Sequence, residues 1–112
     1  NMDLESIPIK DQEVILRYNC NLTTGGTTEE CHSEVHDFYI QLAIRAVKAL
    51  DSEFGGVDII ANDITKPEKC AVNEVNYNPG LRVHYKVNKG KKVEVAIPIM
   101  EYIREKYLNS EK

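Results

Sequence analysis

The sequence predicts a small α+β domain, an antiparallel sheet with helices packed on one face. The first observation is a set of short runs rich in β-forming residues: Glu13–Cys20, Gly56–Ala61 and Cys70–Tyr77. The second is Ser33–Ser52, where apolar side chains recur at three- and four-residue steps, as in an amphipathic helix. Only a short polar turn separates the second and third runs, so we expect them to form an antiparallel hairpin.

The helix predicted over Ser33–Ser52 has a recognisable start and stop. Ser33 is a favourable N-cap, and Gly55 with Gly56 ends the periodic stretch. The side chains expected to face the sheet are Val35, Phe38, Tyr39, Leu42, Ala46, Ala49 and Leu50. This pattern predicts a helix laid along the sheet.

The C-terminal third predicts further short elements. Leu81–Val87 is expected to be a strand and Lys91–Ala96 to continue extended. Pro98 can open a final helix in its first turn, with Ile99, Met100, Ile103 and Tyr107 toward the core. We expect residues 1–12 to be a disordered or linker segment, residues 13–108 to form the domain, and residues 109–112 to be a tail.

Composition excludes several classes of function. The chain has 112 residues and a formal net charge of −4, so it lacks the basic surface that tracks nucleic acid. No apolar run is long enough to cross a membrane, and the N-terminus lacks a signal-peptide pattern. Three cysteines without paired spacing favour free thiols. We therefore expect a cytoplasmic protein that binds neither nucleic acid nor membrane.

Three oxygen-bearing side chains are predicted to share one face of the hairpin. Glu74 and Asn76 are two residues apart, so they point the same way, and Asp58 can face them from the neighbouring strand. Carboxylate and amide oxygens are ligands that Mg²⁺ accepts, with room left for water or phosphate. The alternative is an ordinary solvated strand face.

The segment Asn21–Thr28 contains Gly25 and Gly26 among threonines. It is interpreted either as a flexible connector or as a loop whose amides and hydroxyls hold an anion. Just beyond it, Cys31, His32 and His36 lack a fourth metal ligand at useful spacing. We expect the two histidines to be capping or surface residues.

Several segments together carry a family resemblance. LRYNCNLTTGGT, then EVH opening a helix, GVDII, and NEVNYNPGLRVH occur in that order between Val14 and Ile103. The chain resembles the C-terminal lobe of an ATP-grasp ligase, nearest to the ATP-grasp modules of cyanophycin synthetase and of the bifunctional glutathione synthetase. The resemblance implies ATP and Mg²⁺ (or Mn²⁺) as cofactors, and transfer of the γ-phosphoryl group to a carboxylate that an amine then attacks.

The resemblance also implies roles for individual residues. It places the metal ligands at Asp58, Glu74 and Asn76. It makes Arg17 a phosphate-side cation that also contacts the cofactor, and it groups Asn21 with it as catalytic. Gly25 and Gly26 would contact the cofactor and Arg82 the substrate, while His84 is a weaker candidate that is better interpreted as a surface residue.

An ATP-grasp ligase binds its nucleotide between two lobes, and the resemblance covers one. The N-terminal and central lobes of the same polypeptide are therefore expected partners, and this chain alone is expected to be inactive. The substrate would be a small amino acid or peptide, and a homo-oligomer is left open. The alternatives are a ligase module of the glutathione synthetase type and a noncatalytic binding domain that retains the fold.

Overall fold

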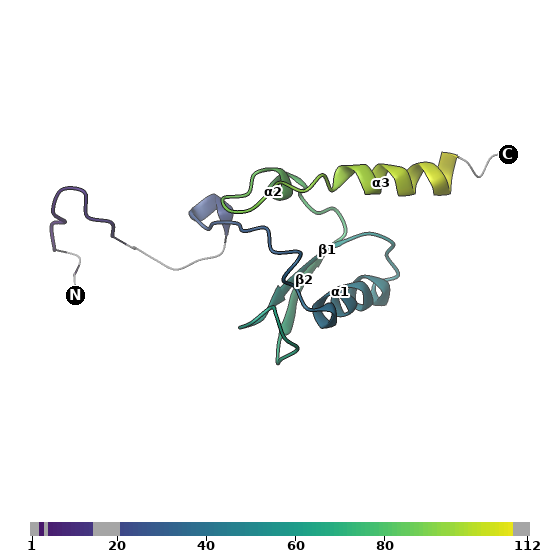
Figure 1. Ribbon diagram of the computed structural model, residues 1–112, viewed down its shortest axis with the longest axis horizontal. Helices are drawn as coiled ribbons and strands as arrows, with labels where there is room; N and C mark the ends of the chain where they lie inside the picture. The colour runs from purple at the N-terminus through teal and green to yellow at the C-terminus, as the bar shows by residue number, and fades with distance from the viewer. Residues whose placement is uncertain (1–2, 4, 15–20, 109–112) are drawn as a thin grey trace.

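The computed structural model describes residues 3, 5–14 and 21–108. Its elements are η1 (Leu22–Thr24), α1 (Asp37–Ala49), β1 (Gly56–Ile60), β2 (Ala71–Asn76), α2 (Arg82–Tyr85), α3 (Ala96–Ile103) and η2 (Arg104–Leu108). Helix α1 lies beside the β1–β2 hairpin, and α3 extends away from both (Figure 1). The small α+β fold predicted from the sequence is confirmed. Within the described ranges, no helix is long and apolar enough to cross a membrane.

The β1–β2 hairpin is antiparallel, as predicted. Asp58 lies opposite Glu74, and Gly56 opposite Asn76. The register shifts between Asp58 and Ile59, because Ile59 pairs with Val72 and leaves Asn73 as an extra residue. The pairs from Gly56–Asn76 to Asp58–Glu74 therefore keep a regular register, and their side chains alternate between the two faces of the sheet.

Helix α1 begins at Asp37, so the predicted N-cap at Ser33 is wrong. The cap is His36, whose Nδ1 accepts a hydrogen bond from the Phe38 amide at 3.1 Å. The His36 amide is itself engaged by the Ile64 carbonyl at 2.8 Å. A contact with a distant loop thus sets the helix start, and the expectation that His36 caps is confirmed.

The C-terminal end of α1 also falls short of the prediction. Asp51 adopts φ +55°, a left-handed conformation that reverses the chain before the two glycines are reached. Leu50 lies just beyond the last helical turn and is 62% exposed, so it is not buried against the sheet as expected.

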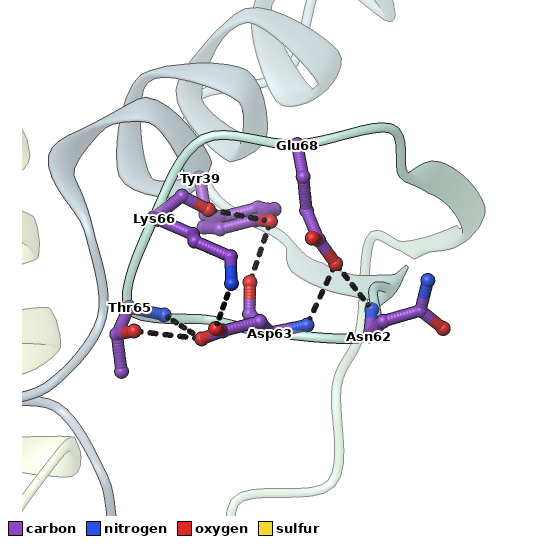
Figure 2. A network of polar contacts seen from close by, with 6 residues as sticks. All are labelled: Tyr39, Asn62, Asp63, Thr65, Lys66 and Glu68. Atoms are coloured by element: carbon purple, nitrogen blue, oxygen red, sulfur yellow. Dashed lines mark hydrogen bonds and ion pairs between the residues drawn. The ribbon is translucent and has the colours of Figure 1, made fainter.

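The core of the described chain is centred on Tyr39 in α1, which is only 4% exposed. Its hydroxyl donates to the Asp63 carbonyl at 2.8 Å and is 3.1 Å from the Lys66 carbonyl (Figure 2). Burial, followed by the nearby Glu68 carboxylate, raises the pKa of Tyr39, so the phenol stays protonated and able to donate. Tyr39 therefore joins α1 to the loop between the two strands.

That loop is stabilised by its own carboxylates. Glu68 Oε1 accepts from the amides of Asn62 at 3.0 Å and Asp63 at 2.8 Å. Asp63 accepts from the Thr65 amide at 2.9 Å and pairs with Lys66 at 2.8 Å (Figure 2). These side-chain oxygens satisfy the backbone amides of Asn62, Asp63 and Thr65, and the loop is thereby stabilised in one conformation.

Asp63 makes the stability of the loop depend on pH. The Lys66 ammonium, followed by the Thr65 donors, holds the pKa of Asp63 well below its ordinary value of 3.8. A carboxyl with a lowered folded pKa stabilises the fold fully above its unfolded pKa, and this contribution disappears as the pH falls through the folded value. We expect Asp63→Asn to lower Tm at about pH 7 and to have a smaller effect at about pH 3. Equal losses of Tm at both pH values in thermal melts would contradict the ion pair.

The expected strand over Leu81–Val87 is wrong. Residues 82–85 form the short helix α2 rather than a strand, and the strand pairing found within the described ranges does not include them. The His84 amide instead bonds to the Leu81 carbonyl at 3.1 Å, and the His84 carbonyl accepts from the Val93 amide at 2.9 Å. Apolar Val83, Tyr85 and Val87 alternate along this segment and are half-buried.

Helix α3 contains Pro98 in its first turn, as predicted, but it does not pack on the sheet. Among the elements it contacts only η2, and Met100 and Tyr107 are more than half exposed. An ion pair from Lys106 to Glu53 and a hydrogen bond from the Tyr107 hydroxyl to Glu53 at 3.2 Å tie its end to the loop after α1. The expected core positions of Met100, Ile103 and Tyr107 are therefore wrong.

Two further predictions concern the cysteines and the first predicted strand. Cys31 and Cys70 are free thiols, as expected, whereas Cys20 lies outside the described residues. Residues 15–20 of the predicted strand Glu13–Cys20 also lie outside them.

Candidate functional site

The candidate site begins with the hairpin face that carries Asp58, Glu74 and Asn76. Asp58 and Glu74 are directly opposed, and Asn76 follows Glu74 by two residues, so all three side chains leave the same face of the sheet. Val57 lines a cavity with α1 residues, and Val75 is its cross-strand partner. The three polar side chains therefore point away from α1, as the sequence predicted.

The charges on this face fit a hard cation. Asp58 and Glu74 are both exposed, and like charges directly opposed on a sheet repel each other. None of the ion pairs within the described ranges involves either carboxylate. A divalent cation would relieve this repulsion, and the Asn76 amide would supply a third oxygen.

Only two of the three candidate metal ligands are carboxylates. Within the described ranges no group of three or more His, Cys, Asp or Glu side chains is arranged to hold a metal ion. Two carboxylates and one amide suit Mg²⁺, which keeps several waters or phosphate oxygens in its coordination shell. A tetrahedral zinc site is not indicated.

The Asn-Pro-Gly break folds back beside this face. A Cβ built on Gly56 would lie 2.7 Å from Cβ of Pro79, so glycine is what lets the proline ring approach the first residue of β1. Because Gly56 pairs with Asn76, this contact fixes the end of β2 at the candidate ligand.

We expect Gly56→Ala to force Pro79 away from the strand and to destabilise the fold by about 1–3 kcal/mol, as overpacking does. Gly80→Ala is the matched control, because nothing lies within 4 Å of a Cβ at Gly80. Chemical denaturation of the two variants measures the difference. Equal stability of the two variants would show that the Pro79 contact is not tight.

A cavity of about 780 Å³ adjoins the polar face at the outer edge of β1. Its walls are residues 27–30, β1 with Ala61, Asn73 of β2, and the apolar side chains around α2. Asp58 belongs to its lining, and Asn73 and His84 add two further hydrogen-bonding groups. Sequence analysis missed Asn73, because alternation alone gives no signal for the register shift that displaces it.

The glycine-containing loop is a compact turn rather than an open connector. Asn21 Oδ1 accepts from the Thr23 amide at 2.9 Å and from the Thr23 hydroxyl at 2.7 Å, which caps η1. Gly25 adopts φ +101° and closes the turn. The side-chain oxygen of Asn21 is therefore used within the loop, and the catalytic role given to Asn21 stays a prediction.

The remaining predicted residues lie around this arrangement. Arg82 is exposed and opens α2 just beyond the Asn-Pro-Gly break. Arg17 lies outside the described residues. The roles of Arg17, Gly25, Gly26 and Arg82 stay predictions.

Comparison with protein families identifies the class. The model of the RimK-like ATP-grasp domain matches residues 10–103, which is most of the chain. The chain belongs to the RimK-like ATP-grasp family. The hairpin carrying Asp58, Glu74 and Asn76 lies within the matched residues.

Individual proteins similar to this chain include two kinds of biosynthetic enzyme. The chain is 33% identical over 106 residues to the glutathione biosynthesis bifunctional protein GshAB of Listeria monocytogenes, covering 94% of this chain and 14% of that protein. It is 38% identical over 95 residues to GshAB of Pasteurella multocida, covering 80% and 12%. Cyanophycin synthetase of Synechocystis is 33% identical over 104 residues, covering 90% and 12%. The chain thus spans about one-eighth to one-seventh of these relatives. No solved structure matches it.

Proposed function

We propose that this chain is the metal- and phosphate-holding lobe of an ATP-dependent carboxylate–amine ligase. The observation that carries the proposal is the opposed pair Asp58 and Glu74, with Asn76 beside it, on a face turned away from the helix. Two carboxylates held directly opposite each other, with no ion pair among the described residues, are costly on a surface without a function. Their position within the matched ATP-grasp residues supports a role in binding a metal–nucleotide complex.

The proposed reaction has two steps. In the first, a carboxylate oxygen of the substrate attacks the γ-phosphorus of ATP, the bond to the β-phosphate oxygen breaks, and ADP leaves. In the second, an amine attacks the acyl carbon, the bond to the phosphate oxygen breaks, and the nitrogen loses a proton. The products are an amide, ADP and phosphate.

The residues of this chain would supply positions and charges for that reaction. Asp58, Glu74 and Asn76 would hold Mg²⁺, which when bound neutralises phosphate charge. Arg82 would hold a carboxylate of the substrate through paired hydrogen bonds. The cavity beside Asp58 would receive the group to be activated, since its mixed apolar and polar lining suits an amino acid or peptide.

Both classes of relative are consistent with amino-acid or peptide substrates in this lobe. The alternative of a ligase module of the glutathione synthetase type rests on the relatives named for glutathione biosynthesis. The cyanophycin synthetase relatives support the other assignment at similar identity.

The test uses the full-length polypeptide that contains this chain. ADP release is measured with ATP, Mg²⁺ and a panel of amino acids and short peptides, with hydroxylamine added to trap an acylphosphate as a hydroxamate. The proposal predicts ADP release that needs a particular carboxylate, and a hydroxamate of that carboxylate. The 112-residue chain alone is the control and should be silent. Absence of ADP release across the panel would favour a noncatalytic binding domain.

A further inference from the structure

Two segments far apart in the sequence are fastened together beside the cavity. The Thr28 amide donates to Asn88 Oδ1 at 2.8 Å, and the Thr28 hydroxyl is 3.2 Å from the same oxygen. In return, the Thr28 carbonyl accepts from the amides of Asn88 at 2.9 Å and Lys89 at 3.1 Å. We call this set of contacts between Thr28 and Asn88 the clip.

Neighbouring contacts extend the clip. The Glu30 amide donates to the Lys89 carbonyl at 2.9 Å, and the Lys89 ammonium pairs with Glu29. Gly90 adopts φ +91°, and a Cβ there would lie 2.9 Å from Cβ of Glu30. The glycine thus allows the two backbones to approach closely, which few other residues would permit.

The clip lies between two parts of the candidate site. On one side, Thr28 is in the cavity wall and follows the glycine-containing loop closed at Gly25. On the other, Asn88 comes six residues after Arg82 and four after His84, which also lines the cavity. Asp58 of β1 lines the same cavity, so a shift of the clip would change the shape of the cavity that this carboxylate lines.

We propose that Thr28 and Asn88 are positioning residues that hold the cavity wall at residues 27–30 against residues 86–89, which follow α2, and so set the fit of the carboxylate substrate. The inference rests on the proposed function, because it concerns the same cavity. Neither residue needs to touch the substrate. The side-chain oxygen of Asn88 carries the contact, so a variant that keeps an oxygen there should keep the function.

The test combines hydrogen exchange and kinetics in the full-length polypeptide. Asn88→Ala removes the acceptor, whereas Asn88→Asp keeps an acceptor oxygen at Oδ1. Thr28→Val and Thr28→Ser form the corresponding pair for the hydroxyl. Asn62→Ala is the matched control, because Asn62 is exposed and its side-chain amide points away from its neighbours (Figure 2).

In Asn88→Ala we expect amide exchange at residues 26–30 to accelerate about tenfold, since the Thr28 amide and hydroxyl both lose their acceptor, Asn88 Oδ1. We also expect KM for the carboxylate substrate to rise about tenfold or more, with KM for ATP unchanged. Asn88→Asp and Asn62→Ala should behave like the unmodified protein.

The possible failures are distinct. If the unmodified protein turns over and Asn88→Ala leaves exchange and KM unchanged, the positioning role is overturned. Faster exchange with an unchanged KM would show a purely structural contact and would also overturn it. If the unmodified protein itself has no turnover, the proposed function fails, and the positioning assignment fails with it.

Discussion

Replacing Glu74 by glutamine in the full-length polypeptide is expected to reduce ATP-dependent amide formation by at least about 100-fold. Mutating a residue that only hydrogen-bonds to a metal ligand commonly lowers metal affinity or activity by about 10–100-fold, and a direct ligand should matter at least as much. The change keeps the shape of the side chain and removes one of two opposed charges. Loss of that charge should weaken metal binding while relieving the repulsion from Asp58. Folding should therefore be unchanged or slightly improved.

Turnover is measured as ADP release at saturating ATP over a range of Mg²⁺ concentrations, with circular dichroism to check folding. Glu101→Gln is the matched control, because Glu101 is exposed on α3, which does not contact the sheet. A high Mg²⁺ concentration should restore part of the lost rate in Glu74→Gln. A rate equal to that of the control at every Mg²⁺ concentration would remove Glu74 from the metal site.

The largest expected effect on stability comes from Tyr39. Tyr39→Ala would empty the one buried side-chain position among the described residues and remove the hydroxyl that reaches the Asp63 carbonyl. We expect Tm of the 112-residue chain to fall by roughly 10–20 °C, or the chain to remain unfolded. Tyr39→Phe should cost only about 5 °C, since it keeps the packing and loses the hydrogen bonds.

The comparison of the two variants separates packing from hydrogen bonding. Ile40→Ala is the control, because Ile40 lies next in the same helix and is 37% exposed. Thermal melts followed by circular dichroism give the three Tm values. A loss in Tyr39→Ala no larger than in Ile40→Ala would show that the core is not centred on Tyr39.

Sequence patterns predicted the parts of the fold that depend on local periodicity. The hairpin and its polar face followed from alternation, and Asp58, Glu74 and Asn76 share that face as expected. The long helix was predicted correctly in kind but not in its limits. Its start is set by a contact between His36 and Ile64, which are distant in sequence, and its end by the left-handed conformation of Asp51.

The features that sequence could not predict depend on contacts between distant segments. The register shift at Asn73 breaks the alternation without any residue type that marks it. The helix over residues 82–85 forms where the pattern predicted a strand, and its backbone amides bond locally, that of His84 to the Leu81 carbonyl and that of Lys86 to the Arg82 carbonyl. The clip between Thr28 and Asn88 joins residues 60 positions apart, and neither residue has a local motif.

The exposed apolar side chains of α3 have a related cause. Ile97 is 55% and Met100 is 62% exposed, so their periodicity indicated an amphipathic helix but not the surface that would bury it. An amphipathic pattern shows which face of a helix is apolar, but it does not show which other part of the protein covers that face.

The most direct test of the metal-holding role is to measure Mn²⁺ binding to the full-length polypeptide in the presence of ADP. The electron paramagnetic resonance signal of free Mn²⁺ reports how much of the metal is bound. The account predicts that Asp58→Asn and Glu74→Gln each weaken Mn²⁺ binding by about tenfold or more, whereas Glu101→Gln does not. Mn²⁺ affinity that is the same in all three variants and the unmodified protein would contradict the account.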